Sequence, residues 1–403
     1  ALAALVLLSV GLPLPAVASS RYSLRGEGEA TLPQRADARA LGGAEAAADI
    51  PSLTGNPASL VFTQDSRFYG SWETEWIRAE ETLPTENPVA KDYSGYVPNL
   101  GLVFPLRNNL TLGLGLLVER RVDARIELPR TVTDGPNYTQ VFEATGNHLR
   151  IPVGLAWNHP RVQVGSTLDL LLVNSERRWR NDFEPGSEFT DSNDLVKRHL
   201  FGVGWRVGAR VPVTSRVALG GWLSLPGNVD GDLRFENDDN DDSDDLVLDL
   251  EAELPVRYAV GLELRPTDRW RVAGDWVHED WEGAEPADTA DVHVNVDRFA
   301  VGVEWGERGD SWPARIGYRT EPLHVLDDHD PARAEEIREH AVSLGSGFGF
   351  AGGRGVLDGY LEYGWRGVAD ESEYYEQFVR FGLTLTGFEE WSLRRPPEAE
   401  EDW

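Results

Sequence analysis

The stretch from His199 to Leu225 constrains the fold more than any other part of the sequence. Alternate residues from Phe201 to Val211 are apolar, whereas the residues between them are mostly glycine and arginine. A period of two indicates an extended strand with two different faces. Glycine and arginine cannot fill a dry core. The apolar face continues over about ten residues, which is the length that a tilted strand needs to cross a bilayer.

The same alternation recurs from Val61 to Phe388 and predicts about fourteen strands, an even number that lets an antiparallel barrel close. The connections alternate between short and long, as they do in outer-membrane barrels with short periplasmic turns and long outer loops. Short turns are expected at residues 107–109, 158–161, 212–216, 265–269, 306–311 and 351–355, and long loops at 79–92, 121–146, 176–198, 227–245, 279–291, 320–339 and 367–374. The pattern predicts an all-β transmembrane antiparallel barrel, with apolar side chains on lipid and polar ones around a lumen.

Four regions follow from this pattern. Residues 1–18 are expected to be part of a secretory signal peptide, because an uncharged apolar run ends in the small residues of Ala16-Val17-Ala18. Residues 19–60 precede the first strand and form either a periplasmic arm or a plug inside the lumen. Residues 61–388 form the barrel, and residues 389–403 form an acidic periplasmic tail. The expected location is the outer membrane of a cell of the Gram-negative type.

Composition excludes several classes of function. The formal net charge of −30 argues against nucleic acid as a partner. The chain has no cysteine, which argues against a secreted domain stapled by disulfides. It contains neither Gly-x-Ser-x-Gly nor His-Glu-x-x-His. We therefore expect no enzymatic activity and no cofactor. Because the predicted barrel spans the outer membrane, we expect membrane lipid as a partner.

The segment before the first strand carries a family resemblance. Gly42-Gly43 and an alanine-rich run lead to Gly55-Asn56-Pro57-Ala58-Ser59-Leu60. This resembles the "NPA" region of the FadL-type family, which comprises outer-membrane transporters of long-chain fatty acids and other hydrophobic compounds. The end of the last strand, residues 378–391, also resembles the ending of such barrels.

The resemblance implies a fourteen-strand barrel, an N-terminal hatch anchored by Asn56, Pro57 and Ala58, and lateral release of an apolar ligand through a kink in the wall. It implies passive uptake of hydrophobic or amphipathic small molecules such as long-chain fatty acids. The chain departs from the family in its polar candidate outer loops at residues 176–198 and 227–245. Two other classes stay open, namely a structural or partner-binding barrel and a general diffusion porin.

Arginines on predicted lumen faces are the candidate ligand-binding residues, because a guanidinium can pair bidentately with a ligand carboxylate. The alternative is that they pair with lumen carboxylates such as Glu263, Asp275, Asp358 and Glu362, or with the hatch. The candidates are Arg150, Arg206, Arg210, Arg257, Arg315, Arg319 and Arg380.

Two further patterns have a functional and a structural interpretation. The acidic run at residues 237–245 could hold a divalent cation through Asp239, Asp241, Asp242 and Asp244, or it could be a solvated loop. Glycines on the lumen face could leave room for a hatch or ligand, or could relieve strain where the barrel bends. These glycines are Gly113, Gly115, Gly154, Gly202, Gly204, Gly345, Gly347 and Gly349.

Overall fold

The computed structural model describes residues 20, 28–31, 35–81, 89–106, 109–132, 135–237, 246–284, 295–306, 312–322, 338–367 and 374–389. The N-terminal part contains β1 (Glu29–Ala30), α2 (Ala36–Arg39) and the 3-10 helix η2 (Pro57–Phe62). The long strands are β2 (Ser66–Glu81), β3 (Val89–Pro105), β4 (Leu110–Arg130), β5 (Tyr138–His159), β6 (Val162–Phe183), β7 (Ser192–Pro212), β8 (Val217–Asn237), β9 (Leu246–Glu253), β10 (Val256–Thr267), β11 (Trp270–Asp280), β12 (Val296–Trp305), β13 (Ala314–Pro322), β14 (Arg338–Phe350), β15 (Gly355–Arg366) and β16 (Tyr374–Glu389), with the short helix η4 (Ala351–Gly353) before β15.

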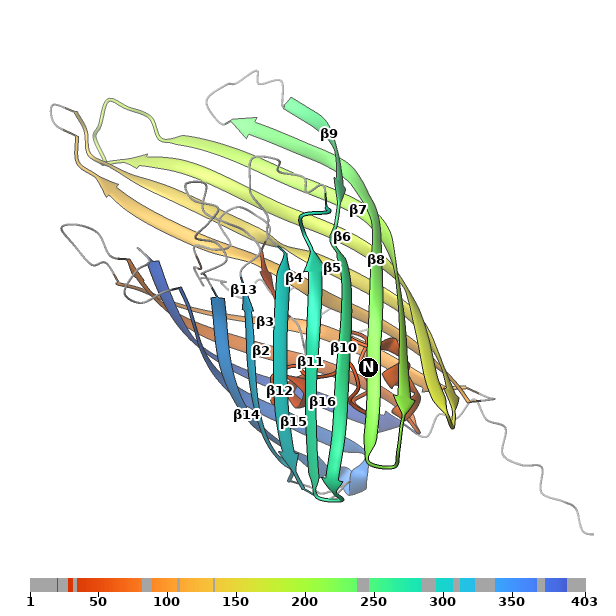
Figure 1. Cartoon of the computed structure of the whole chain (residues 1–403). Coiled ribbons are helices and arrows are strands. Elements are labelled where there is room, and N and C mark those ends of the chain that lie inside the picture. The colour runs from red at the N-terminus through yellow and green to blue at the C-terminus, as the bar shows by residue number, and fades with distance from the viewer. Residues whose placement is uncertain are drawn as a thin grey trace, which may run out of the picture.

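These strands close into one antiparallel barrel (Figure 1). Each strand pairs with its neighbour in the chain, and β16 pairs with β2 to complete the ring. Both β9 and β10 pair with β8, one after the other along its length, so they form a single interrupted strand. The wall therefore has fourteen strands, which confirms the predicted fold.

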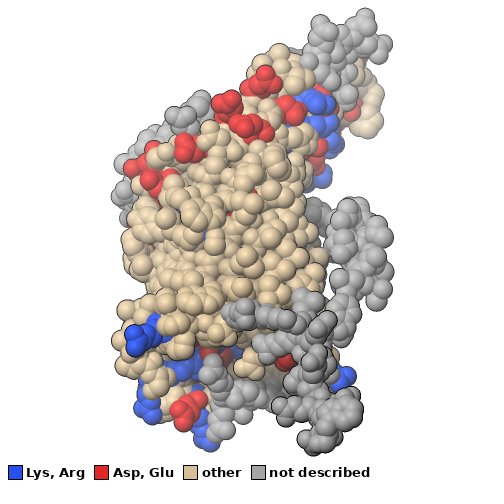
Figure 2. All heavy atoms as spheres, turned by 90° about the vertical axis from the view of Figure 1, so that its right-hand side faces the viewer, with Lys and Arg blue, Asp and Glu red and all other residues tan. Residues whose placement is uncertain are grey.

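The polarity of the wall is reversed relative to a water-soluble sheet. Phe201 and Trp205 on β7 are each 51% exposed on the outside, whereas their chain neighbours Leu200 and Arg206 are buried. On the face that Figure 2 shows, an uncharged belt crosses the middle of the molecule, with charged side chains above and below it. An outward apolar belt on a closed barrel is the arrangement that a bilayer requires. Among the described residues, no helix has the length and apolar character needed to span a membrane.

The wall is taller on one side than on the other (Figure 1). We call the taller side, formed by strands β4 to β8, the tall wall. Strands β4 to β8 have 21 or 22 residues each, whereas β11, β12 and β13 have 11, 10 and 9. The long loops expected at residues 121–146, 176–198 and 227–245 are therefore mostly strand. Above the apolar belt both faces of a strand meet polar surroundings, so the alternation disappears from the sequence although the ladder of backbone hydrogen bonds continues. The expected short turns are all present, apart from residues 107–108 and 307–311, which lie outside the described residues.

Apolar residues alternate from Leu250 to Leu264 in the sequence, which predicts one continuous strand, but the structure interrupts this strand at Leu254 and Pro255. We expected its even-numbered residues to share the outer face. Instead Leu250 and Leu254 pack inside against a buried cluster, whereas Val260 lies outside and is 54% exposed. The interruption reverses which face the even-numbered residues occupy, because side chains alternate strictly only within an unbroken strand. An apolar surface is thereby placed inside the lumen.

The segment from α2 to η2 lies inside the barrel near the short-turn end, and its residues are almost all buried. Glycines on the inner face of the wall let this backbone approach closely. A Cβ added at Gly113 or Gly115 would meet Leu53 or Leu60, and one added at Gly345 would meet Ala40. The same holds at Gly165, Gly208, Gly220, Gly302 and Gly317, which the sequence did not single out. We call residues 35–62 the plug.

Candidate ligand site in the barrel lumen

A group of charged side chains surrounds Glu119 on the inner face of the tall wall. The Glu119 carboxylate lies 2.7 Å from Arg150 Nε, 2.8 Å from Arg257 Nη2 and 3.5 Å from Arg206 Nη2. A second carboxylate, Asp169, lies 3.1 Å from Arg150 Nη1. Three guanidiniums thus share two carboxylates. We call these five residues the upper-lumen cluster.

Arg206 is held less closely by the Glu119 carboxylate than Arg150 or Arg257 is. Its side chain is fully buried, and its guanidinium lies 4.6 Å from the centre of the Trp222 ring. Nη1 donates to the carbonyl oxygens of Thr54 and Gly55 in the plug. Among the described residues, Nε and Nη2 of Arg206 find no hydrogen-bond acceptor. Because a buried donor without an acceptor costs free energy, Arg206 is suited to receive an anionic group.

An apolar surface adjoins this cluster. Leu171, Val173, Leu200, Val229 and Ala252 form one buried group on β6 to β9, with Leu250 and Leu254 packed against it. A cavity of about 30 Å³ lies between this surface and the cluster, and Arg150, Asp169, Leu171, Leu254 and Arg257 all line it. A space of that size holds roughly one water molecule. The site is therefore closed, and an alkyl chain enters it only when side chains move.

The seven predicted arginines all lie on inner faces of the wall, but they divide into groups. Arg150, Arg206 and Arg257 belong to the upper-lumen cluster. Arg210 pairs with Glu263 at 3.1 Å and donates to Ala47 O in the plug, and Arg315 pairs with Glu304 and Asp358. Arg319 and Arg380 lie on the opposite side of the lumen. The role of all seven arginines as ligand contacts stays a prediction.

Arg319 and Arg380 belong to a second cluster, whose arginines also pair with carboxylates of β1, β2 and β16. Glu362 accepts from both of them at 3.2 Å, and Arg39 of the plug lies 3.3 Å from the same carboxylate. Glu339 pairs with Arg319, Arg380 and Arg366. We call Arg319, Glu339, Glu362, Arg366 and Arg380 the β13–β16 cluster.

The Asn-Pro-Ala motif fastens the plug to the tall wall. Asn56 Nδ2 donates to Ala46 O at 2.7 Å and to Ala209 O of β7 at 2.9 Å. Asn56 Oδ1 accepts from Ala58 N at 3.0 Å and caps η2, which begins at Pro57. A side chain at Gly165 or Gly208 would collide with this turn. The placement agrees with the anchoring role that the resemblance implies, and that role stays a prediction.

The wall is incompletely paired between β3 and β4. Their ladder runs only from Asn99 opposite Leu117 to Pro105 opposite Thr111, although both strands continue beyond Asn99 and Leu117. The free edge of β4 is occupied instead by β1, with Glu29 opposite Arg121. The N-terminal segment therefore stands in this gap as a short added strand.

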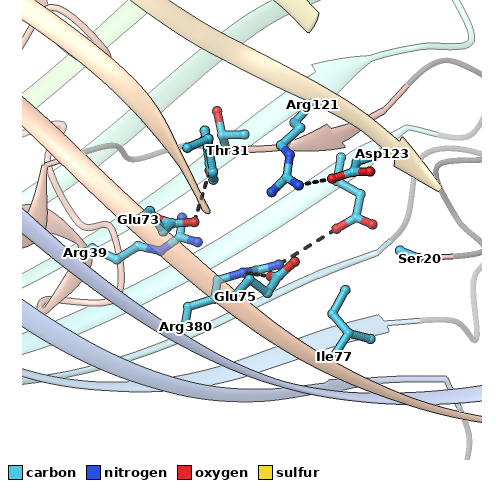
Figure 3. Close-up of a pocket in the computed structure, with 12 residues that line it drawn as sticks. Ser20, Thr31, Arg39, Glu73, Glu75, Ile77, Arg121, Asp123 and Arg380 are labelled. Carbon is cyan, nitrogen blue, oxygen red and sulfur yellow. Dashed lines mark hydrogen bonds and ion pairs between the residues drawn. The ribbon is translucent and has the colours of Figure 1, made fainter. Parts of the chain in front are cut away.

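Polar side chains line the space beside the gap (Figure 3). Arg121 pairs with Asp123 on one side of a cavity of about 30 Å³, and Arg380 pairs with Glu75 across from them. Tyr96 OH donates to Glu73 at 3.0 Å. The gap is closed by charge pairs and by β1 rather than by apolar packing.

Sequence reasoning missed Glu119, Leu171 and Leu254. The acid at position 119 follows a run of leucines on β4, and only its three arginine partners show its importance. The candidate cation ligands Asp239, Asp241, Asp242 and Asp244 lie outside the described residues. Within the described part of the chain, no three metal-ligating side chains form a group.

Comparison with solved structures identifies the class of fold. A Pseudomonas aeruginosa FadL homologue is 13% identical with a TM-score of 0.62, and the match covers 90% of this chain and 99% of that one. The Pseudomonas putida toluene transporter TodX is 15% identical with a TM-score of 0.60, over 88% and 98% of the two chains. The Ralstonia pickettii toluene transporter TbuX is 14% identical with a TM-score of 0.56, over 88% and 98%. The sequence matches no protein-family model and no curated protein.

The chain therefore has the fold of FadL-type outer-membrane barrels along nearly its whole length. At these identities the likeness establishes the fold alone. The resemblance drawn from the Asn-Pro-Ala region is confirmed at that level.

Proposed function

We propose that this protein is an outer-membrane channel for passive uptake of hydrophobic or amphipathic small molecules. The observation that carries the proposal is the upper-lumen site, where an apolar surface from β6 to β9 meets three arginines that share two carboxylates. An alkyl chain fits the apolar surface, and a carboxylate fits the donors of Arg206. Long-chain fatty acids combine both features. The solved barrels of the same fold are described as hydrocarbon channels and toluene transporters, which supports an apolar ligand.

The plug and the gap in the wall define the route in this proposal. The plug occupies the lumen near the short turns, so it blocks direct passage of a ligand from the upper-lumen site to the short-turn end. The gap between β3 and β4 leads sideways toward the membrane and is closed by β1. Lateral release requires β1 to leave the edge of β4. The backbone N–H of Thr31, directly after β1, donates to the backbone oxygen of Glu119 at 3.0 Å. A ligand carboxylate that displaces the Glu119 side chain from its arginines therefore disturbs a contact that holds β1 in place.

The test is direct binding of laurate to the full chain in lipid nanodiscs, read by native mass spectrometry and calorimetry. We expect one laurate in the upper-lumen site and at least tenfold weaker binding at that site in Arg206→Gln, which corresponds to about 1.4 kcal/mol. The control Arg216→Gln changes an exposed arginine on a short turn and should bind as the wild type does. Equal affinity in wild type and Arg206→Gln would refute the role given to this site.

A general diffusion porin makes a different prediction. Such a porin conducts ions steadily with its N-terminal segment in place. The wild-type chain in planar bilayers should instead show low conductance, because the plug fills the lumen between the wall strands. Steady high conductance of the wild type would favour the porin.

A further inference from the structure

A second cavity opens at the short-turn end of the barrel, below the plug. Its volume is about 830 Å³, which lies within the range of ligand pockets in proteins. The plug contributes Arg35, Ile50 and Phe62 to its lining, and the wall contributes Arg67 and Phe388 among others. We call this cavity the lower bowl. It lies across the plug from the upper-lumen site and shares no lining residue with it.

Most charges of the lower bowl are already paired. Asp49 accepts from Arg265 and Arg271 at 2.9 and 2.8 Å, and Arg315 pairs with Glu304 and with Asp358. Toward β10 to β15, these contacts pair Asp49, Glu304 and Asp358 with arginines. The β2 and β16 side differs, because its cations outnumber their partners.

Arg67 is the clearest case. It lies on β2 opposite Phe388 on β16, and its guanidinium is 5.0 Å from the centre of the Phe388 ring. No carboxylate of the described residues lies within ion-pair distance of Arg67, and its buried Nε has no acceptor there. A cation held against an aromatic ring, with a donor to spare, is a receptor for an anion.

Two neighbouring groups point to the same conclusion. Arg35 of the plug is 4% exposed and lies 4.9 Å over the ring of Tyr69, two residues from Arg67 on the same face of β2. Arg35 uses Nε and Nη2 to bind Asp37 at 3.0 and 2.9 Å, and its buried Nη1 has no acceptor among the described residues. Thr386, opposite Tyr69 on β16, is buried with an equally unpartnered hydroxyl. Three side chains that line the bowl thus each carry a polar atom with no hydrogen-bond partner among the described residues.

We infer that the lower bowl is a second binding site, and that it takes a carboxylate-bearing amphiphile. Arg67, Arg35 and Thr386 hold the carboxylate, and Ile50, Val61, Phe62 and Phe388 receive the alkyl chain. The apolar lining is what distinguishes an amphiphile from a bare anion, because a bare anion gains nothing from burying hydrocarbon. The site is reached from the short-turn side without passage through the plug. It therefore does not depend on the proposed uptake.

A fluorophore placed in the bowl reports on this site alone. The chain has no cysteine, so Val356→Cys, in the lining of the bowl, gives a unique attachment point. The labelled full chain in nanodiscs is titrated with laurate, with dodecanol and with inorganic phosphate. We expect saturable binding of laurate, and at least tenfold weaker binding of dodecanol and of phosphate. Phosphate as tight as laurate would overturn the amphiphile, and dodecanol as tight as laurate would overturn the carboxylate.

The residues are tested by substitution in the same labelled protein. Arg67→Gln should weaken laurate at least tenfold, and Arg216→Gln, on an exposed turn at the same end, should leave it unchanged. Arg67→Lys keeps the charge without the planar fork and should fall between them. Thr386→Val provides a second variant that preserves the ion pairs and should weaken laurate by several fold. Unaltered laurate binding in folded Arg67→Gln would overturn the site, whatever uptake measurements show.

Discussion

The two charge clusters of the lumen use the same residue types for different purposes. The upper-lumen cluster sets three arginines against two carboxylates beside an apolar surface, whereas the three arginines of the β13–β16 cluster pair with five carboxylates, Glu29, Glu75, Glu339, Glu362 and Glu376. In the β13–β16 cluster the carboxylates of Glu339 and Glu362 are each shared among several arginines, and Glu29 of β1 adds another at 2.6 Å from Arg366. A charged lumen is therefore not in itself a binding site. The balance of partners decides whether a cluster fastens the structure or awaits a ligand.

The largest expected effect is in the β13–β16 cluster. Glu362→Gln removes the carboxylate shared by Arg39, Arg319 and Arg380 and leaves buried cations without a partner. We expect the free energy of unfolding to fall by about 3–5 kcal/mol, measured by urea unfolding of the barrel in detergent. Glu127→Gln serves as the control, because the pair of Glu127 with Arg125 is exposed and should be worth at most about 1 kcal/mol. Equal losses of stability in the two variants would show that the cluster contributes no more to stability than an exposed ion pair.

The matching change in the upper-lumen cluster should respond differently. Glu119→Gln also strands buried arginines, but here a ligand carboxylate can replace the lost one. We expect laurate at a hundred times its dissociation constant to restore about 2.7 kcal/mol of stability to Glu119→Gln. At the same laurate concentration the wild type and Glu362→Gln should gain less, because in both of them Glu119 competes with laurate for the same arginines. The same urea titrations with and without laurate measure both, and equal rescue of the two variants would erase the distinction between the clusters.

The plug connects the two sides of the lumen, so its anchors offer a smaller perturbation. Pro57→Leu should loosen the turn that Gly165 and Gly208 accommodate on the tall wall, while Arg39 still holds the other side through Glu362. We expect a loss of about 1–2 kcal/mol and a raised leak of small solutes, seen as conductance in planar bilayers. Pro160→Leu, in an exposed short turn, is the control and should conduct as the wild type does. Unchanged conductance of Pro57→Leu would count against the anchor.

The smallest expected effect concerns the pH dependence of the plug. Burial raises the pKa of Glu45 above its ordinary value of about 4.5, and hydrogen bonds from Thr54 offset this only in part. The folded protein therefore holds this proton more tightly, and the associated stability is lost as pH rises above about 4.5. We expect the unfolding temperature to fall less between pH 4.5 and pH 8 in Glu45→Gln than in the wild type.

Asp37 provides the opposite case within the plug. Although burial acts to raise it, pairing with Arg35 lowers the pKa of Asp37 to about 2. Its contribution is complete above pH 3.8 and is lost only as the pH falls toward 2. Asp37→Asn should therefore keep the wild-type difference between pH 4.5 and pH 8. A parallel change in both variants would show that Glu45 is not the group that titrates.

The sequence predicts the part of this structure that the bilayer enforces. Phe201 and Trp205 alternate with Gly202 and Arg206 because hydrocarbon lies on one side of the strand and the lumen on the other. The contact between the Asn56 turn and the wall was implied only by the family resemblance, and Gly165 and Gly208, which admit the turn, were not singled out. The lateral pairing of strands followed from the alternation of short and long connections.

The remainder depends on contacts between distant parts of the chain. No local pattern shows that Glu119 on β4 meets Arg257 on β10, or that Arg39 of the plug meets Glu362. The reversal of faces at Pro255 was hidden, because apolar residues continue at the same alternation on both sides of the break. The tall strands were hidden for another reason: above the belt no apolar face marks them.

The central claim is that hydrocarbon surrounds the barrel and charge lies within it. Because the chain has no cysteine, spin labels can be placed singly at Leu200→Cys and Phe201→Cys in nanodiscs, and their collision with oxygen and with a water-soluble nickel chelate can be compared. We predict that oxygen, which concentrates in lipid, relaxes the label at position 201 more than nickel does, and that this advantage disappears at position 200. Identical accessibility at the two positions, or greater nickel accessibility at 201, would contradict it.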